Sequence, residues 1–73
     1  MPEEQTFNYA LGDFLCHART RSNLTQAELA RRIGVSPQQI QKYESGKNRI
    51  SVYRMWQILH ATNMSIAEFF ENK

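Results

Sequence analysis

Apolar residues recur along much of the chain at intervals of three or four positions, the spacing that places them on one face of an α-helix. No stretch alternates between apolar and polar residues for long, and no Asn-Gly or Asp-Gly pair marks a hairpin turn, so we predict no strand. The first helix is expected over residues 7–21, where the helical spacing is carried by Phe7, Leu11, Phe14, Leu15 and Ala18. The pattern as a whole predicts an all-α fold, a compact bundle of five short helices.

Three capping boxes mark the starts of later helices. In a capping box a Ser or Thr is followed three residues later by Glu or Gln, so that each side chain can accept the other residue's backbone N–H. The pattern occurs at Thr25, Ser36 and Ser65. Pro37 adds a proline at the first helical position, where its missing N–H costs nothing. Ser51 is expected to cap the remaining helix.

Asparagine and glycine mark the helix ends. Asn23 and Asn63 suit the left-handed backbone that terminates a helix, and Gly34 allows a sharp turn. The third helix is expected to end near residues 44–46. The inward faces of the four later helices are expected to hold Leu29, Ala30 and Ile33, then Ile40 and Tyr43, then Met55, Ile58, Leu59 and Thr62, and finally Ile66, Phe69 and Phe70.

Length and composition are those of one small domain. The chain has 73 residues, of which 41% are hydrophobic and 22% charged, so intrinsic disorder is not expected. We predict a disordered tail over residues 1–5 and a single domain over residues 6–73. Cys16 is the only cysteine, which excludes an internal disulfide. No apolar run approaches the roughly 18 residues of a membrane span, and the acidic N-terminus is unlike a signal peptide, so we expect a cytoplasmic protein.

Charge is distributed unevenly along the chain. Residues 19–54 carry eight basic side chains and two acidic ones, whereas the segments on either side are both net negative. A basic middle between acidic flanks favours a localised surface for a polyanion, although a solvated charged face would account for the charge alone.

Residues with catalytic or metal-binding chemistry are few. Cys16, His17 and His60 are the only soft metal ligands, and adjacent helical residues diverge by about 100°, so no zinc site is expected. Cys16 is better read as a small core or boundary residue. The sequence contains no recognisable Ser–His–acid arrangement and no glycine-rich phosphate-binding loop. We therefore expect no catalytic residue, no metal, no cofactor and no small-molecule ligand.

The segment from Thr25 to Gly46 consists of two short capped helices joined by a turn at Gly34. This is the form of a helix-turn-helix, whose second helix enters the major groove of DNA. On a helical wheel the outward residues of the second helix are Gln38, Gln41, Lys42 and Ser45, with Pro37 and Gln39 flanking. Glutamine can bond adenine and lysine can donate to guanine, but glutamines are also good surface helix formers.

Residues 11–70 resemble the phage repressor and Cro type of helix-turn-helix domain, the lambda-repressor-like five-helix bundle of small bacterial and phage transcription regulators. The resemblance implies a sequence-specific regulator that binds operators in double-stranded DNA, usually as a dimer. It is carried by Leu11-Gly12 with Leu15 and Arg19, by Leu24-Thr25-Gln26-Ala27-Glu28-Leu29-Ala30, by Gly34-Val35-Ser36 and Ile40, and by Tyr43-Glu44-Ser45-Gly46-Lys47 with Arg49 and Ile50.

The resemblance also implies roles for individual positions. Base-reading candidates are Gln38, Lys42, Gln39, Gln41 and Pro37, although proline cannot donate a hydrogen bond. Phosphate-binding candidates are Gln26, Ser36, Lys47, Arg49, Ser51 and Tyr53. Arg19 and Glu44 are implied to form a partly buried salt bridge between the first and third helices. Phe14 stands where an arginine is common, which leaves the first helix one charge fewer for DNA. Independently of the resemblance, helix N-termini attract phosphates, and Lys47, Arg49 and Arg54 follow closely in sequence.

For oligomeric state and partner the sequence supports two interpretations each. Trp56 lies about 100° from the inward face of its helix, so it is either a peripheral core residue or, with Phe69 or Phe70, part of an apolar dimer patch. The leading hypothesis is a homodimeric transcription regulator: a phage repressor, a restriction-modification controller or a host regulator. The alternative is an antitoxin or another protein-interaction module with the same fold.

Overall fold

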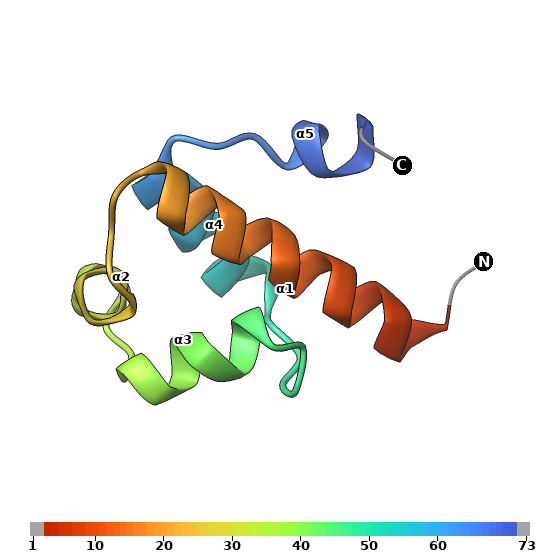
Figure 1. Cartoon of the computed structure of the whole chain (residues 1–73), viewed down its shortest axis with the longest axis horizontal. Coiled ribbons are helices and arrows are strands. Elements are labelled where there is room, and N and C mark those ends of the chain that lie inside the picture. The colour runs from red at the N-terminus through yellow and green to blue at the C-terminus, as the bar shows by residue number, and fades with distance from the viewer. Residues whose placement is uncertain (1–2, 72–73) are drawn as a thin grey trace.

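The computed structural model describes residues 3–71, and within them the chain forms five α-helices and no strand (Figure 1). The predicted all-helical bundle is therefore confirmed. In chain order the helices are α1 (Glu4–Arg21), α2 (Gln26–Ile33), α3 (Pro37–Glu44), α4 (Val52–Thr62) and α5 (Ile66–Glu71). None of these helices is long and apolar enough to cross a membrane.

The first helix begins earlier than its apolar spacing predicted. Because α1 starts at Glu4, the expectation of a disordered tail is wrong for Glu4 and Gln5. Two tertiary contacts stabilise this first part of α1: the Glu4 carboxylate pairs with a loop arginine, and the Phe7 ring packs edge-on against Phe69, 5.6 Å between centroids. Residues 1–2 of the predicted tail and residues 72–73 of the predicted domain lie outside the described residues.

All four predicted caps form, but the complete capping box that was predicted three times is present only at Thr25. Thr25 and Glu28 make a full capping box, with bonds of 3.0 and 2.8 Å, and the bonds from Thr25 hold the pKa of the Glu28 carboxyl below its usual range. Ser36 and Ser51 each accept the N–H three residues ahead, at 3.1 Å. The Ser65 hydroxyl instead accepts the N–H two residues ahead, while Glu68 reaches back to the Ser65 N–H. The sequence therefore predicted all four start points correctly.

The helix ends also follow the sequence. Asn23 and Asn63 adopt the left-handed conformation, with φ of 60° and 53°, and Gly34 does so with φ of 79°. At Gly34 the backbone N–H bonds the Ala30 carbonyl at 2.9 Å and ends α2. This residue turns the chain directly into the cap of α3.

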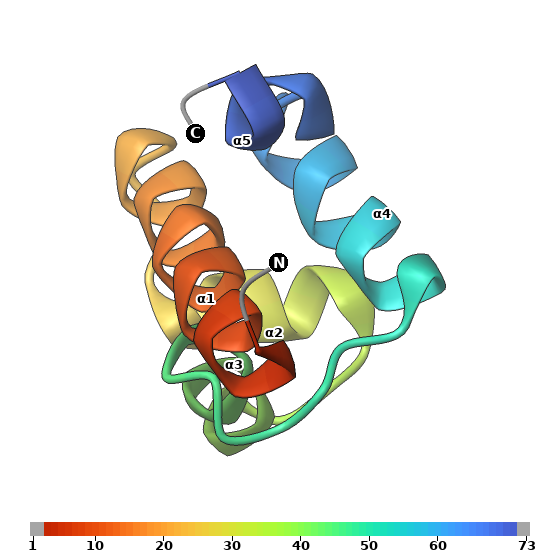
Figure 2. The ribbon, with the colours of Figure 1, turned by 90° about the vertical axis from the view of Figure 1, so that its right-hand side faces the viewer.

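The core lies where α1, α2, α3 and α4 meet. Its most buried large side chains are Leu15, Leu29, Ile40 and Ile58, one from each of these helices. Phe69 of α5 closes one end of the core at 3% exposure, with its ring 5.3 Å from that of Phe14. In both views α5 and α3 lie at opposite ends of the molecule (Figures 1 and 2). The third helix is thus free to present one side to a partner.

Candidate nucleic-acid interface

The third helix presents a polar face to solvent and an apolar face to the core. Ile40 is fully buried, and this burial fixes which side of α3 faces outward. Gln38, Gln41 and Lys42 are all exposed, as the helical wheel predicted, and Pro37 at the first position is exposed too. The remaining base-reading candidate, Gln39, is only half-exposed at the edge of this face. Ser45, the next outward position, is also exposed. The exposed face therefore carries amides and one amine, without an acid.

The angle between α2 and α3 is set by a short turn. The backbone N–H groups of Gly34 and Val35 both bond the Ala30 carbonyl, at 2.9 and 3.0 Å. Leu29 and Ile33 of α2 are buried in the same core as Ile40 of α3. These bonds and contacts hold the two helices as one unit, the helix-turn-helix that the sequence predicts.

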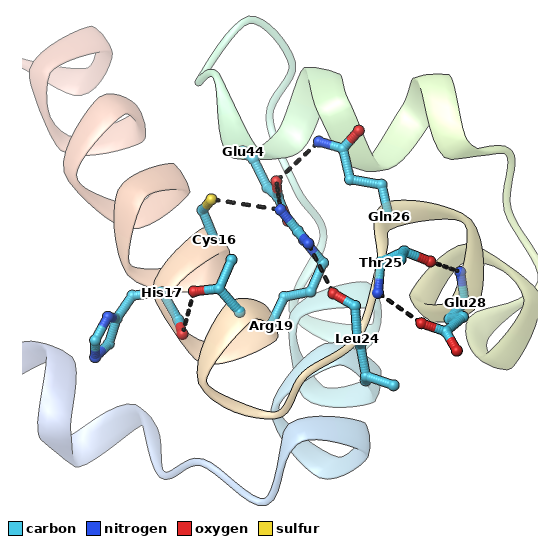
Figure 3. Close-up of polar contacts among 9 residues, drawn as sticks. Cys16, His17, Arg19, Leu24, Thr25, Gln26, Glu28 and Glu44 are labelled. Carbon is cyan, nitrogen blue, oxygen red and sulfur yellow. Dashed lines mark hydrogen bonds and ion pairs between the residues drawn. The ribbon is translucent and has the colours of Figure 1, made fainter.

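A polar cluster beneath α3 ties this unit to α1 (Figure 3). Arg19 of α1 donates from Nε and Nη2 to the two carboxylate oxygens of Glu44, at 2.6 and 3.2 Å, and from Nη1 to the Leu24 carbonyl at 2.7 Å. The Arg19 and Glu44 side chains are 13% and 8% exposed. The implied salt bridge is therefore present and mostly buried, and it raises the pKa of the Arg19 guanidinium.

Gln26 extends the same cluster to the start of α2. Its Nε2 donates to the Glu44 carboxylate at 3.0 Å, so one carboxylate links three helices. The amide nitrogen carries two hydrogens, and one remains to donate to an external acceptor. Cys16 borders the cluster with its Sγ 3.7 Å from Arg19 Nη2. Burial raises the pKa of the Cys16 thiol, which matches the boundary role expected for it.

The loop between α3 and α4 carries three of the phosphate-binding candidates, Lys47, Arg49 and, at its end, Ser51. Gly46 adopts φ of 76° and is buried against Tyr9, where an added Cβ would lie 2.5 Å from the tyrosine Cδ1. The Lys47 N–H then bonds the Lys42 carbonyl at 3.1 Å, which folds the loop back onto the end of α3. Lys47 and Arg49 are both exposed beyond this point.

Arg49 has a partner that sequence reasoning missed. Its Nε and Nη2 contact the two carboxylate oxygens of Glu4 at 2.6 and 2.9 Å, with both side chains largely exposed. The two residues are 45 positions apart, and no local spacing relates them.

Arg54 was grouped with Lys47 and Arg49 as a cation near the phosphate-binding helix N-termini, but in the structure its side chain makes internal hydrogen bonds. Its Nη1 donates to the Ile33 carbonyl and to the Gln57 side chain, both at 2.9 Å, and the residue is half-buried. Because this hydrogen bond satisfies a carbonyl at the end of α2, Arg54 joins α4 to the helix-turn-helix unit. It is not a free cation next to Arg49.

The three dimer candidates separate in the structure. Phe69 is a core residue at 3% exposure, so its assignment to a dimer patch is wrong, whereas Trp56 and Phe70 are 57% and 59% exposed. The Trp56 ring stacks between Tyr53 and His60 on the outer face of α4, with centroids 6.3 and 5.3 Å away. Trp56 and His60 together border two surface hollows, of about 510 and 430 Å³. Trp56 is therefore an exposed ridge, not a peripheral core residue.

The family of the chain follows from comparison with known proteins. A model of the HTH_3 helix-turn-helix family matches residues 17–69, which include all of α2, α3 and α4. The chain belongs to the HTH_3 family. It is thus a DNA-binding helix-turn-helix domain of the transcription-regulator type, and the resemblance to repressor and Cro domains is confirmed.

Two relatives support the same assignment. The HTH_3 chain is 46% identical over 77 residues to a transcriptional regulator in the ATPase CF(0) region of Rhodospirillum rubrum, covering 99% of this chain and 71% of the relative. It is 44% identical over 54 residues to an HTH-type transcriptional regulator of Sinorhizobium fredii, covering 74% of this chain but 38% of the relative. Both relatives are described as regulators, not as enzymes.

Solved structures show the same fold. The clp gene regulator ClgR of Corynebacterium glutamicum superposes with a TM-score of 0.81 at 28% identity, covering 96% of this chain and 87% of that structure. An HTH_3 family transcriptional regulator from Vibrio cholerae superposes with a TM-score of 0.83 at 22% identity, covering 97% and 40%. The second likeness concerns the fold alone.

Proposed function

We propose that this HTH_3 protein is a cytoplasmic transcription regulator that binds a pseudo-palindromic operator as a homodimer, with α3 in the major groove. One observation carries the proposal: an exposed helix face bearing Gln38, Gln41 and Lys42, with no acid, on a helix held by the core and by the Glu44 cluster. Major-groove base edges present the acceptors and donors that such amides and amines bond.

In this proposal, side chains on the outer face of α3 recognise the base sequence of the DNA. Gln38 and Lys42 are the principal readers, one turn apart, and Gln41 and Gln39 lie beside them. A glutamine can bond adenine at two points, and a lysine can donate to guanine. Pro37 has no N–H to donate, so its exposed ring is left for an apolar contact such as a thymine methyl group.

The backbone of the DNA is held by residues around α3. The proposed contacts come from helix N-termini and loop side chains, which bind phosphate irrespective of sequence. They are Gln26, Ser36, Lys47, Arg49, Ser51 and Tyr53. Apart from Gln26, which is half-buried and keeps one amide hydrogen to donate, all of them are exposed.

A second copy is proposed because one helix in one groove buries little surface for strong specificity. The outer face of α4 offers a ridge, Trp56 with His60, between two hollows. In a two-fold dimer the same patch occurs on both copies, so a ridge from each can enter a hollow of the other. Phe70 is the other exposed aromatic candidate for this contact.

Substitutions at two lysines test whether α3 is the helix that recognises the DNA sequence. A preferred site is first selected from a random DNA pool, and binding of each variant to this site and to random DNA is then measured across a salt series. Lys42→Ala should cost about 1–3 kcal/mol on the preferred site and relax preference at one or two positions. Lys47→Ala removes the same charge from the loop and should weaken binding to both DNAs alike, lowering the salt slope by about one per subunit.

Gln38→Ala supplies a test without a change of charge. It should weaken the preferred site and leave random DNA nearly unchanged, because an amide contributes little to phosphate binding. If Gln38→Ala and Lys42→Ala both weakened the two DNAs by the same factor, α3 would not be the reader and the proposal would be wrong.

A further inference from the structure

Among the phosphate-binding candidates, Arg49 is the charged side chain that already forms an ion pair within the described residues. Its guanidinium meets the Glu4 carboxylate at two points, Nε to Oε2 at 2.6 Å and Nη2 to Oε1 at 2.9 Å. Within residues 3–71, Lys42 and Lys47 have no ion-pair partner, although both are exposed and near the same loop. Glu4 and Arg49 are themselves 58% and 78% exposed, so the pair is open to exchange with an anion from solution.

We infer that Glu4 competes with the DNA backbone for Arg49. In the free protein the Glu4 carboxylate occupies Nε and Nη2 of the Arg49 guanidinium, and a phosphate must displace it from these atoms when DNA binds. The inference rests on the proposed binding of DNA by this face of the protein. The loop over residues 45–51 lies at the same end of the molecule as α3 in both views, the end that the proposal turns toward DNA (Figures 1 and 2).

The chemistry of the two anions makes them compete for one edge of the Arg49 guanidinium, the edge formed by Nε and Nη2. A carboxylate and a phosphate each present two oxygens to the same pair of N–H groups on the planar guanidinium. While Glu4 bonds Nε and Nη2, a phosphate cannot approach Arg49 in that geometry. A carboxylate left next to the backbone is also repelled by duplex DNA, which carries about one negative charge per 1.7 Å of its axis.

The cost is small and independent of sequence. An exposed ion pair contributes at most about 1 kcal/mol, so Glu4 reduces affinity without preventing binding. Because Arg49 is proposed to contact phosphate alone, the operator and random DNA should be weakened alike. Glu4 would thus set the overall affinity of the protein for DNA, while the side chains of α3 set its preference.

The test compares two neighbouring glutamates. Glu4→Gln should tighten binding to the selected site and to random DNA by about twofold to fivefold per subunit, and this gain should shrink as salt rises. Glu3→Gln removes the same charge one residue away, and Glu3 has no ion-pair partner within the described part of the chain. Glu3→Gln should therefore leave both affinities nearly unchanged.

A double-mutant cycle separates direct competition from general repulsion. In an Arg49→Ala background, Glu4→Gln should raise the affinity for DNA no more than Glu3→Gln does, because the guanidinium that Glu4 contacts is absent. The inference would be overturned if Glu3→Gln matched Glu4→Gln, or if the gain from Glu4→Gln survived without Arg49. A lower melting temperature with unchanged DNA affinity would also overturn it, since the pair would then be only structural. Failure of the unmodified protein to bind any DNA would instead contradict the proposed function.

Discussion

Glu44 lies in the last turn of α3, yet its carboxylate contacts α1 and α2 rather than solvent. One oxygen accepts from Arg19 Nη2 and Gln26 Nε2, and the other accepts from Arg19 Nε. With the side chain 8% exposed, water cannot readily take the place of these partners. A single side chain thus determines how the end of α3 is held, and removing it leaves a guanidinium with little solvent access.

We expect Glu44→Ala to lower the free energy of unfolding by about 1–3 kcal/mol, because Arg19 loses its anionic partner in a mostly buried position. Urea unfolding followed by circular dichroism measures the change. Gln26→Ala is the matched control: it removes one bond to Glu44 but leaves the ion pair, so its effect should be smaller. An unchanged melting temperature for Glu44→Ala would show that the pair does not stabilise the fold.

At the level of the elements, α1 packs closely against the end of α3 at Gly12. A Cβ at this position would lie 2.5 Å from the Glu44 carbonyl oxygen and 2.7 Å from the Tyr43 carbonyl oxygen. Both are backbone atoms at the end of α3, so no side-chain rotation relieves the overlap. The absence of a side chain at Gly12 is what lets the two helices pack at this distance.

Gly12→Ala should therefore destabilise the protein by about 1–3 kcal/mol, since one helix must shift away from the other. Because the shift would move α3, affinity for the selected DNA site should fall as well. Thermal unfolding and DNA binding measure the two effects. Asp13→Ala, at the next and exposed position of α1, should change stability by no more than about 0.5 kcal/mol. Equal stability of the two variants would contradict the close approach.

At the level of the whole molecule, the described residues leave the aromatic ridge on α4, Trp56 with His60, exposed on the surface. Trp56 is the only tryptophan of the chain and is 57% exposed. A dimer formed through this ridge would bury the ring, and two copies would read half-sites roughly 34 Å apart.

We expect two copies of the chain on a full-length operator, and tryptophan emission that shifts to shorter wavelength as protein concentration rises. Sedimentation of the saturated complex gives the stoichiometry. Trp56→Ala should weaken cooperative binding to the full operator while leaving binding to a single half-site nearly unchanged. Phe70→Ala shows whether the same interface extends to α5. A saturated complex of one copy on the full operator would refute the dimer.

Features that depend on near neighbours in the chain were predictable. Helix starts are decided by a cap and the residues two or three positions ahead, as at Thr25, Ser36 and Ser51, and helix ends by residues that tolerate the left-handed region, as at Asn23 and Gly34. The periodic apolar spacing likewise identified Ile40 as the buried side of α3. These features placed the helix-turn-helix and its outward residues before any tertiary contact was known.

Features that depend on partners distant in sequence were decided only by the packing. Phe69 is buried because α5 folds onto α1. Trp56, also an aromatic residue near an apolar helix face, is exposed because no element within residues 3–71 covers the outer face of α4. Arg49 and Arg54 look alike in sequence, yet one meets a carboxylate 45 residues away and the other a carbonyl 21 residues away. Periodicity shows which side of a helix faces inward, but a charged side chain takes the partner that the assembled helices bring within reach.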